Sequence, residues 1–395
     1  MKCEQLPINH QLIATLQAHK FEKLTLIQEK CIPEILTGQD VAGQAETGSG
    51  KTLAFCLPIL DNIKRREGLQ ALVLTPTREL CMQVADVFRD YGKNLGIRTT
   101  SVHGGVSIGP QIHAMHSSEV VIGTPGRILD HLRRGTMDVR RIRTLVLDET
   151  DKMFEMGFIE DVEDIIRYIP QQRQVLLFSA TISEEVFRLA RKHLRRPIFI
   201  KTQAYVDHRK LRQIYYDIYE QNQKFSLLVH LLKRNTDGLS IVFCGTRRES
   251  DAVSKNLARQ GIRASAIHGG MRQQKRSSSL DALKTQKTKV LVATDVAARG
   301  LDIKNVTYIY NYDVPKTPTE YVHRIGRTAR AGANGAAITL LTERDHDNFR
   351  RVQRNDDFVI ERADMPEFRK IPFLRRTEPR NYSYRRGSPR YSFGR

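Results

Sequence analysis

The sequence of 395 residues has no tryptophan and only five cysteines, none of which form a Cys-x-x-Cys motif. Cysteines this sparse and scattered argue against a disulfide framework and against a structural zinc site. No apolar run approaches the roughly 20 residues that cross a bilayer, and the first ten residues lack the apolar core of a secretory signal. We therefore expect a cytoplasmic protein with free thiols and no membrane partner.

Acidic residues are scarce relative to basic ones. The chain has 44 Asp and Glu against 64 Lys and Arg, which gives a formal net charge of +20. An excess of this size is typical of proteins that bind polyanions, and nucleic acid is the commonest of these. An anionic membrane surface would instead require a basic amphipathic helix or a lipidation motif, and the sequence has neither.

Short apolar runs alternate with amphipathic helical patterns along most of the chain. Strands that are apolar throughout and alternate with helices predict parallel sheets covered on both faces. The expected strands are residues 40–42, 71–74, 98–102, 120–122, 144–147 and 175–178 in the first half, and 240–243, 264–267, 289–293, 306–310 and 336–341 in the second.

The two halves repeat each other's short motifs in the same order. Residues 77–79, 102–105 and 121–124 recur as residues 246–249, 267–270 and 291–294. This repetition predicts a duplicated α/β domain, with residues 1–203 and 211–362 joined by a polar linker at 204–210. Each repeated motif follows a strand, and ligands of such sheets lie at the carboxyl ends of the strands.

The end of the chain differs in composition, and we assign residues 363–395 to a tail. Its last 27 residues, 369–395, hold nine Lys or Arg, one acid and five interleaved aromatics, a net charge of +8. Neither a helical nor a strand period is visible there. We therefore expect a disordered basic tail.

A glycine-rich loop with the sequence Ala-Glu-Thr-Gly-Ser-Gly-Lys-Thr occupies residues 45–52, between an expected strand and an expected helix. This context is typical of a phosphate-binding loop, because backbone N–H groups and the helix N-terminus favour phosphate there. The side chain of Lys51 can reach the β- and γ-phosphates, and the Thr52 hydroxyl can ligate Mg²⁺. The loop residues concerned are Ala45, Thr47, Gly48, Ser49, Gly50, Lys51 and Thr52.

Two further clusters carry charge suited to phosphoryl transfer. Asp148-Glu149-Thr150-Asp151 follows an apolar strand, where Asp148 can hold Mg²⁺ and Glu149 can orient or deprotonate a water. The second cluster is His-Arg-Ile-Gly-Arg-Thr-Ala-Arg at residues 323–330. Its Arg327 and Arg330 can neutralise transition-state charge from the second domain.

The ordered series of motifs resembles the DEAD-box RNA helicases of superfamily 2 over about residues 1–360. Besides the motifs above, the resemblance rests on residues 21–28, 76–80, 104–105, 124–127, 179–181, 242–244, 268–276, 293–295 and 299–302. The resemblance implies two tandem RecA-like domains that bind ATP, Mg²⁺ and RNA. Thr150 departs from the family's usual Ala, and Leu24 and Lys20 depart from its usual Pro and Gly.

The resemblance also implies roles for single residues. Phe21 and Gln28 would recognise adenine, Asp302 would hold the ribose, and Asp151, Ser179, Thr181 and His323 would couple hydrolysis to domain movement. The RNA track would consist of Pro76, Arg78, Gly104, Gly105, Thr124, Arg127, Thr246, Arg247, Thr294 and Arg299. From the residues alone, Thr124-Pro125-Gly126 also fits a simple turn, and Ser179 and Thr181 also fit the end of a strand.

We therefore expect an RNA-stimulated ATPase that grips RNA through its backbone, with low sequence specificity. ATP-driven closure of the two domains would unwind short duplexes or remodel RNA–protein complexes. The chain is expected to be a monomer, with possible protein partners in RNA–protein complexes. A non-unwinding RNA clamp or assembly factor is the alternative, although Lys51, Glu149 and Arg330 are all present. A translocating DNA helicase would carry extra strand-separating domains, and the motifs that mark GTPases and transporter ATPases are missing.

Overall fold

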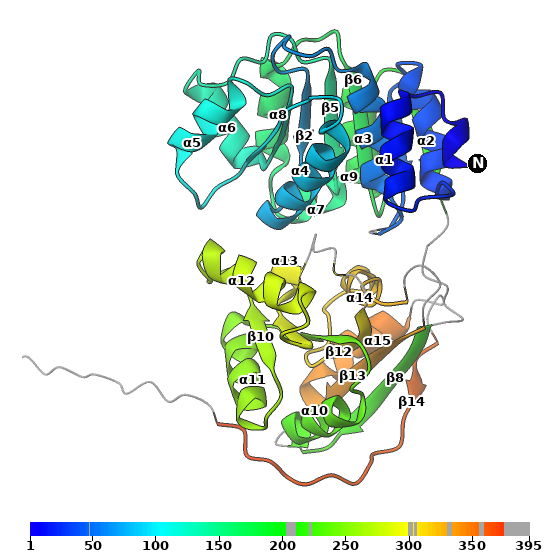
Figure 1. Ribbon diagram of the computed structural model, residues 1–395. Coiled ribbons are helices and arrows are strands. Elements are labelled where there is room, and N and C mark those ends of the chain that lie inside the picture. Colours follow the sequence, from blue (N-terminus) through cyan, green and yellow to red (C-terminus); the bar gives the residue numbers. More distant parts are fainter. Residues whose placement is uncertain are drawn as a thin grey trace, which may run out of the picture.

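The computed structural model forms two α/β bodies, drawn one above the other in Figure 1. It describes residues 1–46, 48–202, 211–220, 223–298, 303, 306–329, 334–354 and 359–374. The first body ends at β7 (Ile198–Lys201), and the second begins at β8 (Leu211–Ile218). The linker predicted at 204–210 lies outside the described residues.

The first body contains a parallel sheet of seven strands. Its other strands are β1 (Val41–Gln44), β2 (Ala71–Leu74), β3 (Thr99–Val102), β4 (Val120–Gly123), β5 (Thr144–Asp148) and β6 (Gln174–Ser179). The spatial order is β3-β4-β2-β5-β6-β1-β7, and every pair is parallel. All six strands predicted in this half are confirmed to within two residues, whereas the edge strand β7 was not predicted.

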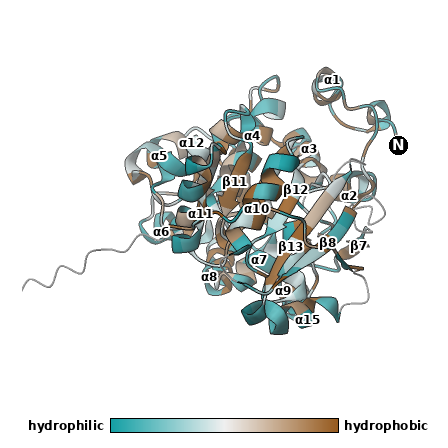
Figure 2. Cartoon of the chain, turned by 90° about the horizontal axis from the view of Figure 1, so that it is seen from below, coloured by the Kyte–Doolittle hydropathy of each residue, from teal (hydrophilic) through white to brown (hydrophobic). Residues whose placement is uncertain are grey.

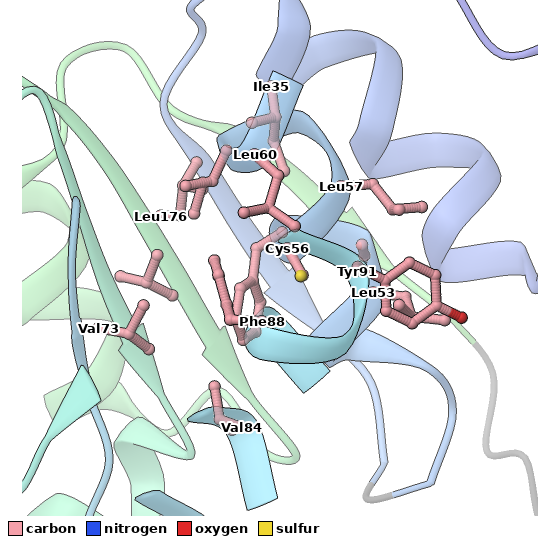
Figure 3. Close-up of a cluster of buried hydrophobic side chains, with 14 of the residues drawn as sticks. Ile35, Leu53, Cys56, Leu57, Leu60, Val73, Val84, Phe88, Tyr91 and Leu176 are labelled. Carbon is pink, nitrogen blue, oxygen red and sulfur yellow. The ribbon is translucent and has the colours of Figure 1, made fainter. Parts of the chain in front are cut away.

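Helices cover both faces of this sheet. They are α1 (His10–Ala18), α2 (Leu26–Leu36), α3 (Lys51–Asn62), α4 (Arg78–Gly92), α5 (Ile108–Met115), α6 (Pro125–Arg133), α7 (Thr150–Glu155), α8 (Ile159–Tyr168) and α9 (Glu184–His193), with a 3₁₀ turn at Cys3–Gln5. Successive strand side chains point to opposite faces. Val73 of β2 therefore joins the core beneath α2, α3 and α4, while Leu72 and Leu74 join the core beneath α6, α8 and α9. Figure 3 shows Phe88 of α4 packed into the first of these cores.

The second body repeats the same topology. Its other strands are β9 (Leu239–Phe243), β10 (Ala264–Ile267), β11 (Val290–Ala293), β12 (Val306–Asn311), β13 (Gly335–Thr342) and β14 (Glu361–Arg362). The order β10-β11-β9-β12-β13-β8-β14 matches the first sheet strand for strand. The predicted duplication and the two-sheet fold class are thereby confirmed.

Helices again surround the second sheet. They are α10 (Gln223–Arg234), α11 (Arg247–Arg259), α12 (Gln273–Lys284), α13 (Asp295–Ala298), α14 (Pro318–Ile325) and α15 (His346–Gln353), with a 3₁₀ turn at Glu343–Asp345. In Figure 2 the strands β11 and β13 are largely brown, while the ribbons of the helices around them, such as α11 and α15, carry teal stretches. This segregation is what burial of apolar strands between amphipathic helices requires.

The segment after β14 corrects the sequence prediction, which placed residues 363–374 in an unpacked tail. The segment runs along the second body below α10 and α11 (Figure 1). The Ile371 N–H donates to the Ser226 hydroxyl at 2.9 Å, and the Phe373 ring packs on Phe225 with centroids 5.0 Å apart. The Asn256 amide bonds both backbone groups of Leu374. Only residues 375–395 remain as the expected tail, and these lie outside the described residues.

Three expectations from the composition concern membrane spans, cysteines and metal sites. Within the described part of the chain, no helix is long and apolar enough to cross a membrane. All five cysteines are free and buried in the two cores. No group of three or more metal-ligating side chains occurs among the described residues.

Candidate nucleotide and RNA site

The phosphate-binding loop lies between β1 and α3, as its sequence predicts. Gly48 and Gly50 have φ values of +87° and +94°, a left-handed conformation that glycine adopts without strain. The helix α3 begins directly at Lys51. The Lys51 ammonium donates to the Ala45 carbonyl at 2.6 Å and is only 6% exposed. The lysine is therefore folded back over the loop that would hold the phosphates, whereas Thr47 lies outside the described residues.

Gln28 connects the segment that is predicted to read adenine to this loop. Its side-chain oxygen accepts from the Thr25 N–H at the start of α2, and its amide donates to the Gly50 carbonyl at 3.1 Å. A Cβ at position 50 would collide with this amide. Gln28 is buried, whereas Phe21 is 38% exposed. The exposed ring is available for stacking, and its contact with adenine stays a prediction.

The acidic motif stands at the carboxyl end of β5. Asp148 is the last residue of the strand, and Glu149 follows with a left-handed φ of +55°. Both side chains are 2% exposed. The Asp148 Oδ1 atom is buried without a hydrogen-bond partner in the described structure. A buried carboxylate oxygen with a free lone pair suits Mg²⁺, which prefers oxygen ligands, so Asp148 fits the metal that the motif implies, and Thr52 as a second ligand stays a prediction.

The electrostatic surroundings of the two carboxylates differ. Burial raises the pKa of Asp148. Burial alone would also raise the pKa of Glu149, but Lys152, Lys51 and Arg327 outweigh it and lower that pKa. Lys152 forms an ion pair with Glu149 at 2.6 Å, and its side chain is completely buried. Glu149 is therefore held ionised among cations from both domains.

Thr150, which departs from the family pattern, has its hydroxyl satisfied within the fold. The hydroxyl donates to the carbonyls of Leu147 and Phe178 at 3.2 and 3.3 Å, and the residue is fully buried. These acceptors belong to β5 and β6, so the hydroxyl links two central strands.

We expect Thr150→Ala to destabilise the first domain by about 1 kcal/mol, the net value of one hydrogen bond. Urea unfolding of the full chain measures this loss, and Thr150→Ser should retain most of the stability. ATP turnover should change little in either variant, because the bond leads into the sheet. A large loss of turnover in Thr150→Ala with unchanged stability would instead place the hydroxyl in the chemistry.

Asp151, Ser179 and Thr181 are in contact. Thr181 donates to the Asp151 carboxylate through its backbone N–H at 3.0 Å and its hydroxyl at 3.1 Å. The Ser179 hydroxyl accepts from the Asp151 N–H at 3.2 Å and donates to the Thr181 carbonyl at 2.7 Å. These bonds connect the end of β6 to the acidic motif, while the role of the three residues in coupling stays a prediction.

The RNA-track residues of the first domain lie at the carboxyl ends of β2, β3 and β4. Arg78 is the first residue of α4, and its guanidinium packs on Gly104 and Gly105 after β3, where any Cβ would crowd it. Arg127 donates to the Val106 carbonyl from both terminal nitrogens, and Thr124 caps α6. Pro76 lines the groove between the two domains that is described below.

The second domain repeats this construction. Arg247 is the first residue of α11 and packs on Gly269 and Gly270 after β10. The Thr246 hydroxyl caps that helix by accepting from the Glu249 N–H at 3.1 Å, and Thr294 follows β11 directly. The motif echoes in the sequence therefore correspond to equivalent positions in the two sheets.

The two domains meet along this track. A groove of about 540 Å³ is lined by Arg78, Gly104, Thr124 and Arg127 from the first domain and by Gly269 and Arg276 from the second. Glu79, which is 3% exposed, forms an ion pair with Arg276 at 2.9 Å and accepts from the Gln273 amide at 3.1 Å. The helices α12 and α13 lie on the side of the second body that faces the first (Figure 1).

The arginine motif, which begins in the last turn of α14 and continues beyond its end at Ile325, contributes to the other side of this interface. Arg327 is 3% exposed, donates to the His323 carbonyl, and is close enough to Glu149 to help lower its pKa. Arg324 makes two bonds to Asp295, at 2.6 and 2.7 Å, and is buried within its own domain. The other predicted residues of this region, Arg299, Asp302 and Arg330, lie outside the described residues.

Several residues of the site received no role from the sequence. Glu79, Gln273 and Arg276 belong to motifs that were recognised, but their pairing connects positions almost 200 residues apart. Lys152 follows the acidic motif, and only the packing around it shows that it is buried against Glu149. A lysine at a helical position directly after a catalytic motif was the available signal.

Comparison with known proteins identifies the family. The DEAD/DEAH box helicase domain matches residues 25–189, and the helicase conserved C-terminal domain matches residues 223–332. The DEAD-box ATP-dependent RNA helicase CshA of Bacillus cereus is 42% identical over 365 residues, which cover 92% of this chain and 69% of that protein.

Solved structures agree with this similarity. Dbp5 of S. cerevisiae bound to RNA and ADP·BeF₃ is 31% identical, with a TM-score of 0.84 over 92% of this chain and 95% of that one. Mss116p bound to single-stranded RNA and AMP-PNP is 27% identical, with a TM-score of 0.83 over 93% and 80%. The agreement extends over both domains, and the chain therefore belongs to the DEAD-box ATP-dependent RNA helicases.

Proposed function

We propose that this helicase hydrolyses ATP with Mg²⁺ between its two domains and uses their closure to separate short RNA duplexes without sequence preference. The observation that carries the proposal is that the ATP site and the RNA groove are each built from residues of both domains. Arg327 of the second domain approaches Glu149 of the first, and Arg276 pairs with Glu79 beside the RNA groove. One movement would therefore assemble or separate both sites.

The hydrolytic step follows from the residues around Glu149. Lys51 and the loop amides would bind the phosphates, and Glu149 would orient the attacking water and accept its proton. Arg327 and Arg330 would neutralise charge that develops on the γ-phosphate. Mg²⁺, held through Asp148 and Thr52, would supply Lewis-acid neutralisation of the phosphate oxygens.

The RNA step follows from the groove. Arginines packed on glycine pairs, together with helix N-termini at Thr77, Thr124 and Thr246, suit phosphate and sugar contacts, which carry no sequence information. A strand held along both domains would be bent on closure. A duplex resists such bending, so one strand would be displaced locally. Asp151, Ser179 and Thr181 would transmit the state of the ATP site to this movement.

The test is a strand-separation assay on a short duplex with a labelled strand. ATP should produce release of the strand at a rate that depends little on sequence, and Glu149→Gln should produce none in multiple turnovers. Stable ATP-dependent binding of single-stranded RNA without any release of duplex strands would favour the alternative, an RNA clamp or assembly factor.

Further properties remain proposals. We propose a monomer of the cytoplasm, supported by five free buried thiols and by the location of both ATP-site and RNA-site residues within one chain. Protein partners of RNA–protein complexes are expected to bind outside the groove.

The basic tail is proposed to hold RNA near the groove. Residues 375–395 contain seven Arg, one acid and four aromatics, a composition suited to counterion release and base stacking. Deleting them should leave ATPase at saturating RNA nearly unchanged while lowering the apparent affinity for RNA. The slope of log affinity against log salt should become shallower by about 2–3 units, below a ceiling of roughly 0.7 per net charge, or about 4.

A matched variant separates charge from length. Replacing the seven tail arginines by glutamine in the full chain should reproduce the loss of salt dependence. An unchanged slope in both variants would mean that the tail serves solubility. Removing residues 369–374 as well should lower stability, because Phe373 and Ile371 pack on α10.

A further inference from the structure

One edge of the first sheet carries an exposed aromatic pair. Phe199 of β7 and Phe187 of α9 are 45% and 38% exposed, and their ring centroids are 5.3 Å apart. Arg191 lies over the Phe187 ring at 5.4 Å. We call the surface formed by Phe187, Arg191, Phe199 and Lys201 the β7 edge surface. It lies at the opposite edge of the sheet from β3 and β4, which lead into the RNA track.

The backbone of β7 is paired on one side only. The N–H groups of Ile198 and Thr202 donate to carbonyls of Asp40 and Gln44, next to and within β1. Because N–H groups alternate in direction along a strand, those of Phe199 and Lys201 point away from β1. In the described part of the chain no strand pairs with this outer side. An unpaired strand edge is a template for a further strand.

The segment that forms this edge is basic, although Glu184 and Glu185 precede it in the first turn of α9. Residues 187–201 contain six Lys or Arg and no Asp or Glu. Lys192 is paired with Glu163, whereas no carboxylate among the described residues lies within ion-pair distance of Arg191, Arg196 or Lys201. A ligand of this edge should therefore be acidic.

We propose that the β7 edge surface docks an extended acidic segment of a partner protein, which adds a strand to the sheet beside β7. Strand addition obtains affinity from main-chain hydrogen bonds and specificity from alternate side chains. Apolar side chains of the added strand would contact Phe187 and Phe199, and its carboxylates would meet Arg191, Arg196 and Lys201. RNA offers the negative charge but has no N–H and C=O groups at ladder spacing, so the open edge favours a peptide.

The direct test measures binding of a labelled peptide of about eight residues, two valines flanked by glutamates, to the full chain by fluorescence anisotropy. A peptide of the same size with lysines in place of glutamates serves as the control ligand. We expect the acidic peptide to bind and the basic one not to bind, and saturating oligouridylate should not displace the acidic peptide. Binding that does not depend on the sign of the peptide charge would overturn the proposal.

Two substitutions at one position separate the backbone from the charge. Lys201→Pro removes an N–H that points away from β1 and has no partner strand in the described part of the chain. Edge strands tolerate such a change, and it should weaken peptide binding about tenfold or more. Lys201→Ala loses the same charge but keeps the N–H, and should weaken binding by less than about threefold. RNA-stimulated ATPase should be unchanged in both variants and shows that they fold.

The remaining outcomes decide against the proposal. Equal affinities of Lys201→Pro and Lys201→Ala would exclude strand addition. If the acidic peptide does not bind and Phe187→Ser with Phe199→Ser lowers RNA affinity, the surface is a stacking platform for nucleic acid. If the acidic peptide does not bind and Phe187→Ser with Phe199→Ser leaves RNA affinity unchanged, the basic residues only protect the edge against aggregation.

Discussion

Glu149→Gln is expected to bind ATP with nearly unchanged affinity and to hydrolyse it roughly 10²–10⁴-fold more slowly, the usual contribution of a general base. Glutamine keeps the size of the side chain but cannot accept the proton of the attacking water. The phosphate ligands are unaffected, because the loop glycines lie between β1 and α3 and Lys51 is the first residue of α3. A closed complex with ATP and RNA should therefore accumulate, and its lifetime can be measured by RNA dissociation after a chase.

Lys51→Ala provides the contrasting variant. Its ammonium is folded over the loop, so its loss should weaken ATP binding itself and produce no trapped complex. The loss of the Glu149 charge also leaves Lys152 as a buried cation without its ion pair, which could prevent folding of Glu149→Gln. ATP binding by this variant is therefore measured first, because a variant that binds ATP is folded. Near-normal turnover in Glu149→Gln would remove Glu149 from the hydrolytic step.

The sequence predicted eleven of the fourteen described strands and missed β7, β8 and β14, for a physical reason. Central strands such as β2 and β11 are buried on both faces and are therefore apolar at every position. The edge strand β7 has alternating exposure, and β14 consists of two exposed residues. β8, which pairs with β13 and β14, mixes buried residues with the exposed Arg212 and the partly exposed Asp217. These three strands owe their structure to pairing with a neighbouring strand, which local composition does not encode.

A similar distinction applies to the site. The loop, the acidic motif and the echoed Arg–Gly pairs were predictable because each depends on a short segment at the end of a strand. The pair of Glu79 and Arg276 depends on how two separately folded domains meet. The packed segment 363–374 was missed because Phe368, Ile371 and Phe373 contact one core without a regular spacing.

Arg327→Ala is expected to reduce RNA-stimulated ATPase by about 10³-fold, the lower end of the range for an arginine that stabilises phosphoryl transfer from another domain. Arg327 is almost completely buried and lies near Glu149, although 178 residues separate them in the sequence. Its guanidinium would act mainly in the transition state, so ATP binding should fall far less than turnover. Single-turnover hydrolysis at saturating ATP and RNA separates the two quantities.

Two companion variants show whether the effect comes from a shared site. Arg327→Lys keeps the charge but loses the planar fork of donors, so it should recover only part of the rate. Residues 1–203 contain both cores of the first domain and should fold, bind ATP weakly and hydrolyse almost none, because they lack the arginine motif at residues 323–330. Near-normal ATPase from that fragment would contradict the two-domain mechanism, since the acidic motif and the phosphate loop would then suffice without the second domain.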